Sequence, residues 1–183
     1  EICQENGSRI SEFQYQSHKI AKGKPVLPGL PATYTEAEEE ALTLTVLLED
    51  AVTKVQVELL YTLFAKGGII ARSVRLCNRG KQSVRLGRAM SLCLDLPDRD
   101  YVWQQLSGCW ARECHIRTRN LEAGITAIGS MRGNSSHEHN PFLVLKRPNA
   151  DERQGEVFGF SLIYSGNFRL QAEVDAHDTL RIL

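Results

Sequence analysis

The feature that most constrains the fold of this chain is a series of short segments in which apolar and polar residues alternate. Residues 42–48 and 55–59 have this two-residue period, which is typical of half-buried β-strands, and the short link 49–53 indicates a hairpin. Residues 69–76 continue the pattern after a Gly-Gly pair, and residues 84–94 indicate another long strand, or two strands, kinked at Gly87.

The second half of the chain repeats this organisation. Further strands are predicted at residues 101–106, 110–118, 124–128, 142–146, 157–164 and 168–174. Helical periodicity is almost absent. Residues 35–41 are either one helical turn, with Thr35 as N-cap and Glu38 as its capping-box partner, or a solvated acidic loop. About ten strands without βα alternation predict an all-β fold of two packed antiparallel sheets. Residues 23–34 are rich in Pro and Gly, and we expect them to form an irregular crossover.

Length and composition narrow the class of protein. A chain of 183 residues is expected to form a single domain, 1–183, and its two ends have the character of a truncated segment. Lys plus Arg and Asp plus Glu both number 22, so no net field favours nucleic acid as a partner. No apolar run approaches the roughly 20 residues of a membrane helix, and five cysteines, an odd number, favour a reducing compartment. We therefore expect a cytoplasmic protein without a membrane partner.

Three carboxylates near the middle of the chain are candidates for glycoside hydrolysis. That reaction uses two carboxyl groups about 5–5.5 Å apart for retention, or about 6.5–9.5 Å apart for inversion. Asp95, Asp98 and Asp100 lie close together in sequence, but Pro97 favours a turn and Arg99 is the expected ion-pair partner. We interpret the segment as an acidic turn held by charge-assisted hydrogen bonds, and we assign no catalytic residue to this chain.

A second candidate site contains His137 and His139. With Cys109, Cys114 or His115 as further ligands, they would form a tetrahedral metal site. The spacing matches no standard zinc module, and turn-forming residues flank the two histidines. Hydrogen bonds to the loop backbone are therefore favoured, and no metal is predicted.

The adjacent pair Cys114 and His115 raises the question of a thiol nucleophile. Neighbours on one strand point to opposite faces, so a buried structural thiol is favoured for Cys114. The glycine-containing segments lack the order of a phosphate-binding loop. We predict no nucleotide or other cofactor.

Sugar binding is a further possibility, because aromatic faces and planar polar side chains match the surface of a pyranose. The aromatic candidates and their polar partners are Trp103, Trp110, Tyr101, Tyr164, Arg112, Arg117, Asn140 and Asn167. Core packing is the default for each aromatic side chain. Trp110 is the preferred sugar contact, and with Arg112, His137 and Asn140 it forms the predicted substrate-binding set.

Several motifs occur together and in order along the chain. The stretches DLPDRDY (95–101), QLSGCWARE (105–113) and RGNSSHEHNPF (132–142), supported by residues 17–20, 29–34 and 154–168, resemble the N-terminal domain of bacterial α-galactosidases of glycoside hydrolase family 36. The likeness extends from about residue 17 to residue 174. Cys109 and Cys114 depart from the residues expected in the motif around Trp110.

The resemblance implies a large β-supersandwich, followed in family members by a catalytic barrel that carries an aspartate nucleophile and an aspartate acid/base. Such enzymes hydrolyse terminal α-1,6-linked galactose, as in melibiose and raffinose, with retention. The implied partners are the protein's own C-terminal barrel, further copies in a homo-tetramer, and α-galactoside oligosaccharides. The domain would serve assembly and active-site shaping, and the chain alone would be inactive.

Two alternatives of other classes stay open at this point. A free-standing carbohydrate-binding module would expose Trp110 or Tyr101 on its surface, whereas an assembly domain would bury both. A metal-dependent enzyme would use His137 and His139, so that substituting either would abolish activity without unfolding the protein.

Overall fold

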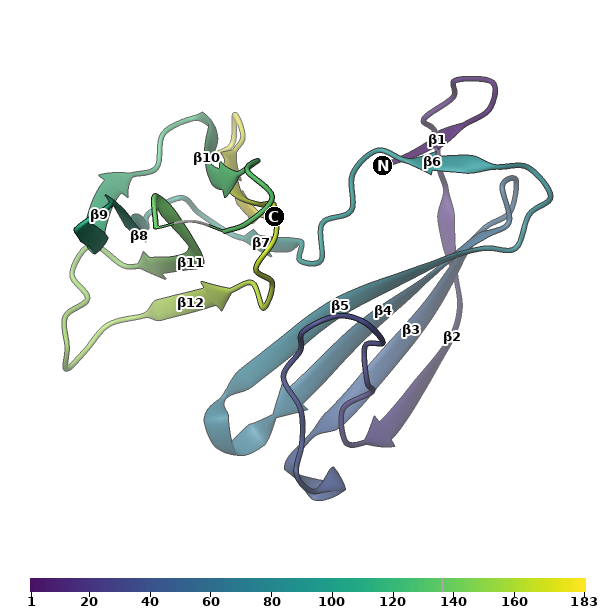
Figure 1. Ribbon diagram of the computed structural model, residues 1–183, viewed down its shortest axis with the longest axis horizontal. Coiled ribbons are helices and arrows are strands. Elements are labelled where there is room, and N and C mark those ends of the chain that lie inside the picture. Colours follow the sequence, from purple (N-terminus) through teal and green to yellow (C-terminus); the bar gives the residue numbers. More distant parts are fainter. Residues whose placement is uncertain (136) are drawn as a thin grey trace. The chain divides into compact units, whose positions relative to one another are not determined.

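The structure, a computed structural model, describes residues 1–135 and 137–183 and consists mainly of antiparallel β-strands (Figure 1). Helical elements among these residues are limited to the 3-10 turns η1 (Glu38–Glu40) and η2 (Ala65–Gly67). The chain divides into two compact units, Glu1–Pro28 with Thr33–Leu92, and Gly29–Ala32 with Cys93–Leu183. The prediction of an all-β antiparallel fold is confirmed, and that of a single domain truncated at both ends stays a prediction.

Within the described ranges, no helix has both the length and the apolar character needed to cross a lipid bilayer.

The first unit contains one four-stranded and one two-stranded antiparallel sheet, in the orders β2-β3-β4-β5 and β1-β6. The strands are β1 (Ile2–Gln4), β2 (Phe13–Lys22), β3 (Leu42–Asp50), β4 (Val55–Phe64), β5 (Ile69–Asn78) and β6 (Val84–Leu86). The predicted hairpin is formed by β3 and β4. Its register places Thr43 opposite Thr62, and their buried hydroxyl oxygens lie 2.8 Å apart. Val46 lies opposite Leu59, on the other, apolar face of the same pair of strands.

The turn between β3 and β4 is organised by Asp50, which is only 3% exposed. Its Oδ1 accepts hydrogen bonds from the backbone N–H groups of Val52 (3.1 Å) and Thr53 (2.7 Å) and from the Thr53 hydroxyl (2.8 Å). Its Oδ2 accepts from the backbone N–H of Glu12 at 2.7 Å, just before β2. These bonds hold the pKa of Asp50 below its ordinary value, and the bond from the Thr53 N–H contributes most.

We expect Asp50→Ala to lower the free energy of unfolding by about 3 kcal/mol, because several donors lose a charged acceptor at a buried site. The folded-state pKa is depressed, so this stabilisation is present above the unfolded pKa of about 4 and is lost as pH falls through the folded pKa. Urea titrations at pH 7 and at pH 3 measure both effects. Asp95→Ala, at an exposed ion pair, is the control and should cost much less stability than Asp50→Ala. Equal losses for the two variants would contradict this account.

The second unit contains two four-stranded sheets, in the orders β10-β13-β14-β7 and β12-β11-β8-β9. The strands are β7 (Leu94–Leu96), β8 (Val102–Cys109), β9 (Arg112–Asn120), β10 (Gly124–Ser130), β11 (His139–Lys146), β12 (Val157–Ser161), β13 (Phe168–Val174) and β14 (Leu180–Ile182). Strand β11 contacts β10 and β13 of the other sheet. The side chains that both sheets bury completely are Trp103, Leu143, Leu145, Ala172, Leu180 and Ile182. This unit is therefore a β-sandwich with its own core.

Three local predictions differ from the structure. Residues 84–94 are not one long strand or hairpin, because β6 pairs with β1 only until the Gly87 N–H binds the Glu1 carbonyl, and β7 pairs with β14 instead. Thr35 does not cap a helix: η1 begins after Ala37, without a side-chain cap. The long strand β2 was not predicted, because nearly all its side chains are exposed and its apolar alternation is weak. The irregular conformation predicted for residues 23–34 is confirmed, since no strand lies there, but the segment is not a crossover, because it links β2 to its neighbour β3 in the same sheet.

Candidate functional site

The candidate site begins at the tight turn between β8 and β9. Trp110 and Ala111 form this turn, not the start of a strand as predicted, and Ala111 has the left-handed φ of 62° that the reversal needs. The Ala111 N–H donates to the Glu113 carboxylate at 2.8 Å. Trp110, just past the end of β8, is 84% exposed. The turn therefore presents a large aromatic surface to solvent.

Gly108 makes this turn possible. A Cβ at this position would lie 2.0 Å from the carbonyl oxygen of Arg112, where the pairing of β8 and β9 shifts register between Ser107 and Cys109. The Gly108 N–H donates to the Glu138 carbonyl at 3.2 Å, which joins the turn to the segment before β11. Only glycine lets the backbone of Arg112 and the backbone of Glu138 come this close to residue 108 without being displaced.

Gly108→Ala is expected to destabilise the chain by about 2 kcal/mol, since the added methyl group overlaps backbone atoms that cannot rotate away. Gly159→Ala in β12 is a matched control, because nothing lies within 4 Å of the position that its methyl group would occupy, and its expected effect is under about 1 kcal/mol. Thermal unfolding followed by circular dichroism compares the two. A Gly108 variant as stable as the Gly159 variant would contradict the proposed turn geometry.

A pocket of about 520 Å³ lies beside this turn. Strand β8 contributes Ser107, Gly108 and Cys109 to its lining. Strand β9 contributes Arg112, His115, Ile116 and Arg117, and the β11 side contributes Glu138 and His139. The lining thus combines guanidinium, imidazole, hydroxyl and carboxylate groups.

The structure brings together only part of the predicted substrate-binding set. Arg112 lines the pocket, whereas Trp110 is on the neighbouring turn and His137 lies exposed in a turn before β11. Asn140 lies on β11, and its Nδ2 is 3.7 Å from the Cys114 Sγ on β9. The four residues therefore belong to one region of the second unit without forming a single cluster.

The prediction of a buried thiol at Cys114 is wrong. All nine residues of β9, an edge strand of its sheet, are exposed. Cys109 is also an exposed free thiol. For a metal, the described residues bring no three His, Cys, Asp or Glu side chains close enough together to hold an ion, so His137 and His139 are not joined by further ligands.

A chain of buried polar groups leads from the core to the pocket. The Trp103 Nε1–H donates to the Gln105 Oε1 at 2.7 Å, and the Gln105 Nε2–H donates to the Ser107 hydroxyl at 2.6 Å. The Ser107 Oγ lies 2.9 Å from the His139 Nδ1. Arg119 of β9 also donates to the Gln105 Oε1. The sequence analysis did not predict this series of hydrogen bonds. The sequence feature that indicates it is the pair of polar residues Gln105 and Ser107 at inward positions of β8.

The aspartates of the acidic turn are engaged by arginines and by the backbone. Asp98 binds the Arg147 guanidinium at 2.5 and 3.2 Å, and its Oδ1 accepts from the backbone N–H of Asp100 at 2.9 Å. Asp95 binds Arg181 at 2.7 Å. Hydrogen bonds from these arginines hold the pKa values of Asp95 and Asp98 below their ordinary range. The prediction of an acidic turn held by charge-assisted bonds is confirmed.

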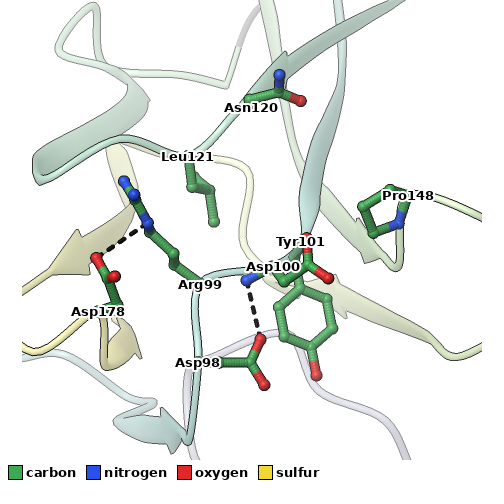
Figure 2. A pocket seen from close by; sticks show the side chains of 8 residues that line it. All are labelled: Asp98, Arg99, Asp100, Tyr101, Asn120, Leu121, Pro148 and Asp178. Carbon is green, nitrogen blue, oxygen red and sulfur yellow. Dashed lines mark hydrogen bonds and ion pairs between the residues drawn. The ribbon is translucent and has the colours of Figure 1, made fainter.

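Figure 2 shows the surroundings of this acidic turn, a pocket of about 320 Å³. The predicted role of Arg99 as the partner of the neighbouring aspartates is wrong, since it reaches Asp178 at 3.0 Å instead (Figure 2). Tyr101 is buried, with its hydroxyl donating to Glu156 at 2.6 Å and the Arg147 guanidinium 4.0 Å from its ring centre. Burial, and then the bond to Glu156, raise the pKa of Tyr101 to about 12. These groups stabilise the fold and present no free pair of carboxylates.

The candidate aromatic residues separate clearly by burial. Trp103 and Tyr101 are 0% and 4% exposed, so the default of core packing is confirmed for both. Tyr164 is partly exposed at 44%, and Asn167 accepts a hydrogen bond from the Gly133 N–H at 2.6 Å. Trp110 is thus the aromatic side chain most available to a ligand among these candidates.

The second unit is thus a β-sandwich that exposes a tryptophan beside a pocket with a mixed polar lining. The family model described as "Glycosyl hydrolase family 36 N-terminal domain" matches residues 1–183. The chain belongs to this family, as its N-terminal domain, and the predicted β-supersandwich is the fold of the family's solved members.

The individual relatives are α-galactosidases. Alpha-galactosidase AgaA of Geobacillus stearothermophilus is 50% identical over 178 residues, which are 97% of this chain and 24% of that protein. Its crystal structure superposes with a TM-score of 0.97 at 49% identity, covering 99% of this chain and 25% of that one. The α-galactosidase of Lactobacillus brevis gives a TM-score of 0.96 at 42% identity, covering 99% of this chain and 24% of its own. The chain therefore spans about a quarter of the length of these relatives.

Proposed function

We propose that this chain is the non-catalytic N-terminal part of an α-galactosidase that hydrolyses terminal α-1,6-linked galactose, of the melibiose and raffinose type, with retention of configuration. The observation that carries the proposal is that the whole chain matches the N-terminal domain of glycoside hydrolase family 36 and is 50% identical to an α-galactosidase over 97% of its length. Variants of AgaA have been solved in complex with raffinose and with stachyose, which supports oligosaccharides of this class as ligands.

The chemistry is assigned to a catalytic barrel that follows this domain. Retaining hydrolysis needs a nucleophile and an acid/base about 5–5.5 Å apart. In this chain Asp95 and Asp98 are engaged by arginines, and the depressed pKa of each opposes the role of general acid. The length of the relatives, about four times that of this chain, leaves room for such a barrel.

The role of the domain in the longer protein is assembly and active-site shaping. Trp110 stacks on a sugar, Arg112 supplies a polar contact from the neighbouring pocket, and His137 and Asn140 lie in the same region of the second unit. The longer protein is a cytoplasmic homo-tetramer that needs no metal or other cofactor. The zero net charge of the chain is consistent with a neutral oligosaccharide as ligand, not a nucleic acid.

Hydrolysis of melibiose and raffinose by the longer protein tests the activity. We expect α-galactose to appear first in the proton NMR spectrum, with the β-anomer following only by mutarotation. First appearance of the β-anomer would contradict retention, and no release of galactose would contradict the activity. Light scattering on the same sample checks the tetramer.

A free-standing carbohydrate-binding module is the second candidate, and the exposure of Trp110 favours it. The buried Tyr101 does not. Calorimetric titration of the chain alone with raffinose separates the two functions. A module would bind without the rest of the protein, whereas an active-site-shaping domain would bind weakly until the barrel completes the site.

A further inference from the structure

The buried polar chain of β8 has a direction that its chemistry dictates. An indole N–H only donates, so the Gln105 atom facing Trp103 must be its carbonyl oxygen. Arg119 donates to the same oxygen, and a guanidinium also only donates. The Gln105 amide is therefore oriented from two sides, and its NH₂ group donates to Ser107.

The orientation of the Gln105 amide determines which nitrogen of the His139 imidazole carries the proton. Ser107 is 8% exposed and its oxygen already accepts from Gln105. Its hydroxyl proton needs an acceptor, because an unpaired buried hydroxyl is costly. The His139 Nδ1, at 2.9 Å, is that acceptor. Neutral His139 then has an unprotonated Nδ1 and carries its proton on Nε2.

We propose that His139 is a sugar-binding residue that donates its Nε2–H in the pocket beside Trp110, with its tautomer set by Trp103 through Gln105 and Ser107. His139 lines the pocket together with Arg112 and Arg117. With Nδ1 occupied by Ser107, Nε2 is the nitrogen left for a ligand. This inference rests on the proposed function, which supplies the α-galactoside.

The pocket offers several hydrogen-bond donors to a ligand rich in oxygen atoms. The two guanidinium groups and the imidazole N–H are donors, which bind the acceptor oxygens of a sugar. Glu138 lines the same pocket, and Arg132 holds its carboxylate at 2.8 Å. The donors of this lining can bind the oxygens of a sugar, and the titration with phosphate decides whether they bind an anion instead.

The tautomer is measured on the 183-residue chain by long-range proton–nitrogen NMR at pH 8. We expect His139 to carry its proton on Nε2. In Gln105→Glu, the new carboxylate only accepts, so it takes the Ser107 proton, and His139 should switch to the Nδ1–H tautomer. Gln104→Glu, one residue along on the opposite face of β8, adds the same charge and should leave the tautomer unchanged. An Nδ1–H tautomer in the unsubstituted chain would overturn the proposal.

Ser107→Ala provides a second route if the glutamate variant does not fold. Removing the hydroxyl should shift the His139 Nδ1 resonance toward that of a free imidazole nitrogen. An unchanged resonance would show that Ser107 is not its partner and would overturn the proposed relay.

Weak ligand binding by the chain alone is followed in the same spectra with raffinose and, separately, with inorganic phosphate. We expect raffinose to shift the His139 and Arg112 resonances, and His139→Ala to weaken raffinose binding about 3- to 10-fold. Shifts confined to Trp110 would overturn the proposal that His139 binds the sugar in this pocket, and would leave the proposed function intact. Shifts of His139 by phosphate alone would overturn the sugar assignment. Release of galactose by the longer protein tests the proposed function independently of all these outcomes.

Discussion

Trp103→Ala is expected to lower the free energy of unfolding of the chain by about 3–5 kcal/mol, the usual range for removing a large aromatic side chain from a core. Trp103 is completely buried and lies opposite Leu145 in the pairing of β8 with β11. Its loss leaves a cavity between the two sheets of the second unit. It also removes the 2.7 Å hydrogen bond to Gln105, whose amide loses one of the donors that orient it.

Urea unfolding followed by far-ultraviolet circular dichroism measures this effect. Trp103→Phe fills most of the cavity but lacks the N–H group, so it should fall between the original chain and the alanine variant. Trp110→Ala removes the same side chain from an 84% exposed position and should change stability by no more than about 0.5 kcal/mol. Similar losses for Trp103→Ala and Trp110→Ala would contradict the assignment of one to the core and the other to the surface.

Trp110→Ala should instead affect catalysis in the longer protein. If Trp110 stacks on the sugar, its removal should lower kcat/KM for raffinose roughly 30-fold, which corresponds to about 2 kcal/mol of lost binding in the transition state. Trp110→Phe keeps an aromatic face and should lose much less. Steady-state kinetics on both variants measures the difference.

Tyr164→Ala is the control for this experiment, because Tyr164 is also partly exposed but lies outside the lining of the pocket beside Trp110. Its kcat/KM should stay close to that of the unsubstituted protein. A Trp110→Ala variant with full activity would show that the exposed indole has another role, such as contact between subunits.

The alternation of apolar and polar residues in the sequence predicted most of the strands of the fold. The hairpin of β3 and β4 and the later strand β13 follow from two-residue alternation, because each buries one face against a neighbour. Strands β2 and β9 give a weak or distorted pattern, since nearly all their side chains are exposed on both faces. Alternation reports burial, so an exposed strand shows little of it.

The candidate site was predicted less completely. The sequence places Trp103 and Trp110 only seven residues apart, yet one is fully buried and the other exposed. The difference arises from a register shift beyond Ser107, for which Gly108 is a sequence signal, and from a left-handed Ala111, which has none. The pairing of Asp98 with Arg147 likewise depends on tertiary contact, whereas adjacency in sequence favours Arg99.

The measurement that tests the central claim most directly is hydrolysis of an aryl α-galactoside by the isolated 183-residue chain, with the longer protein as positive control. We predict rapid release of the aryl group by the longer protein and none above background by the chain. Hydrolysis by the chain itself would contradict the claim that its carboxylates are structural, and would make Asp98, Asp100 and His137 the residues to substitute next.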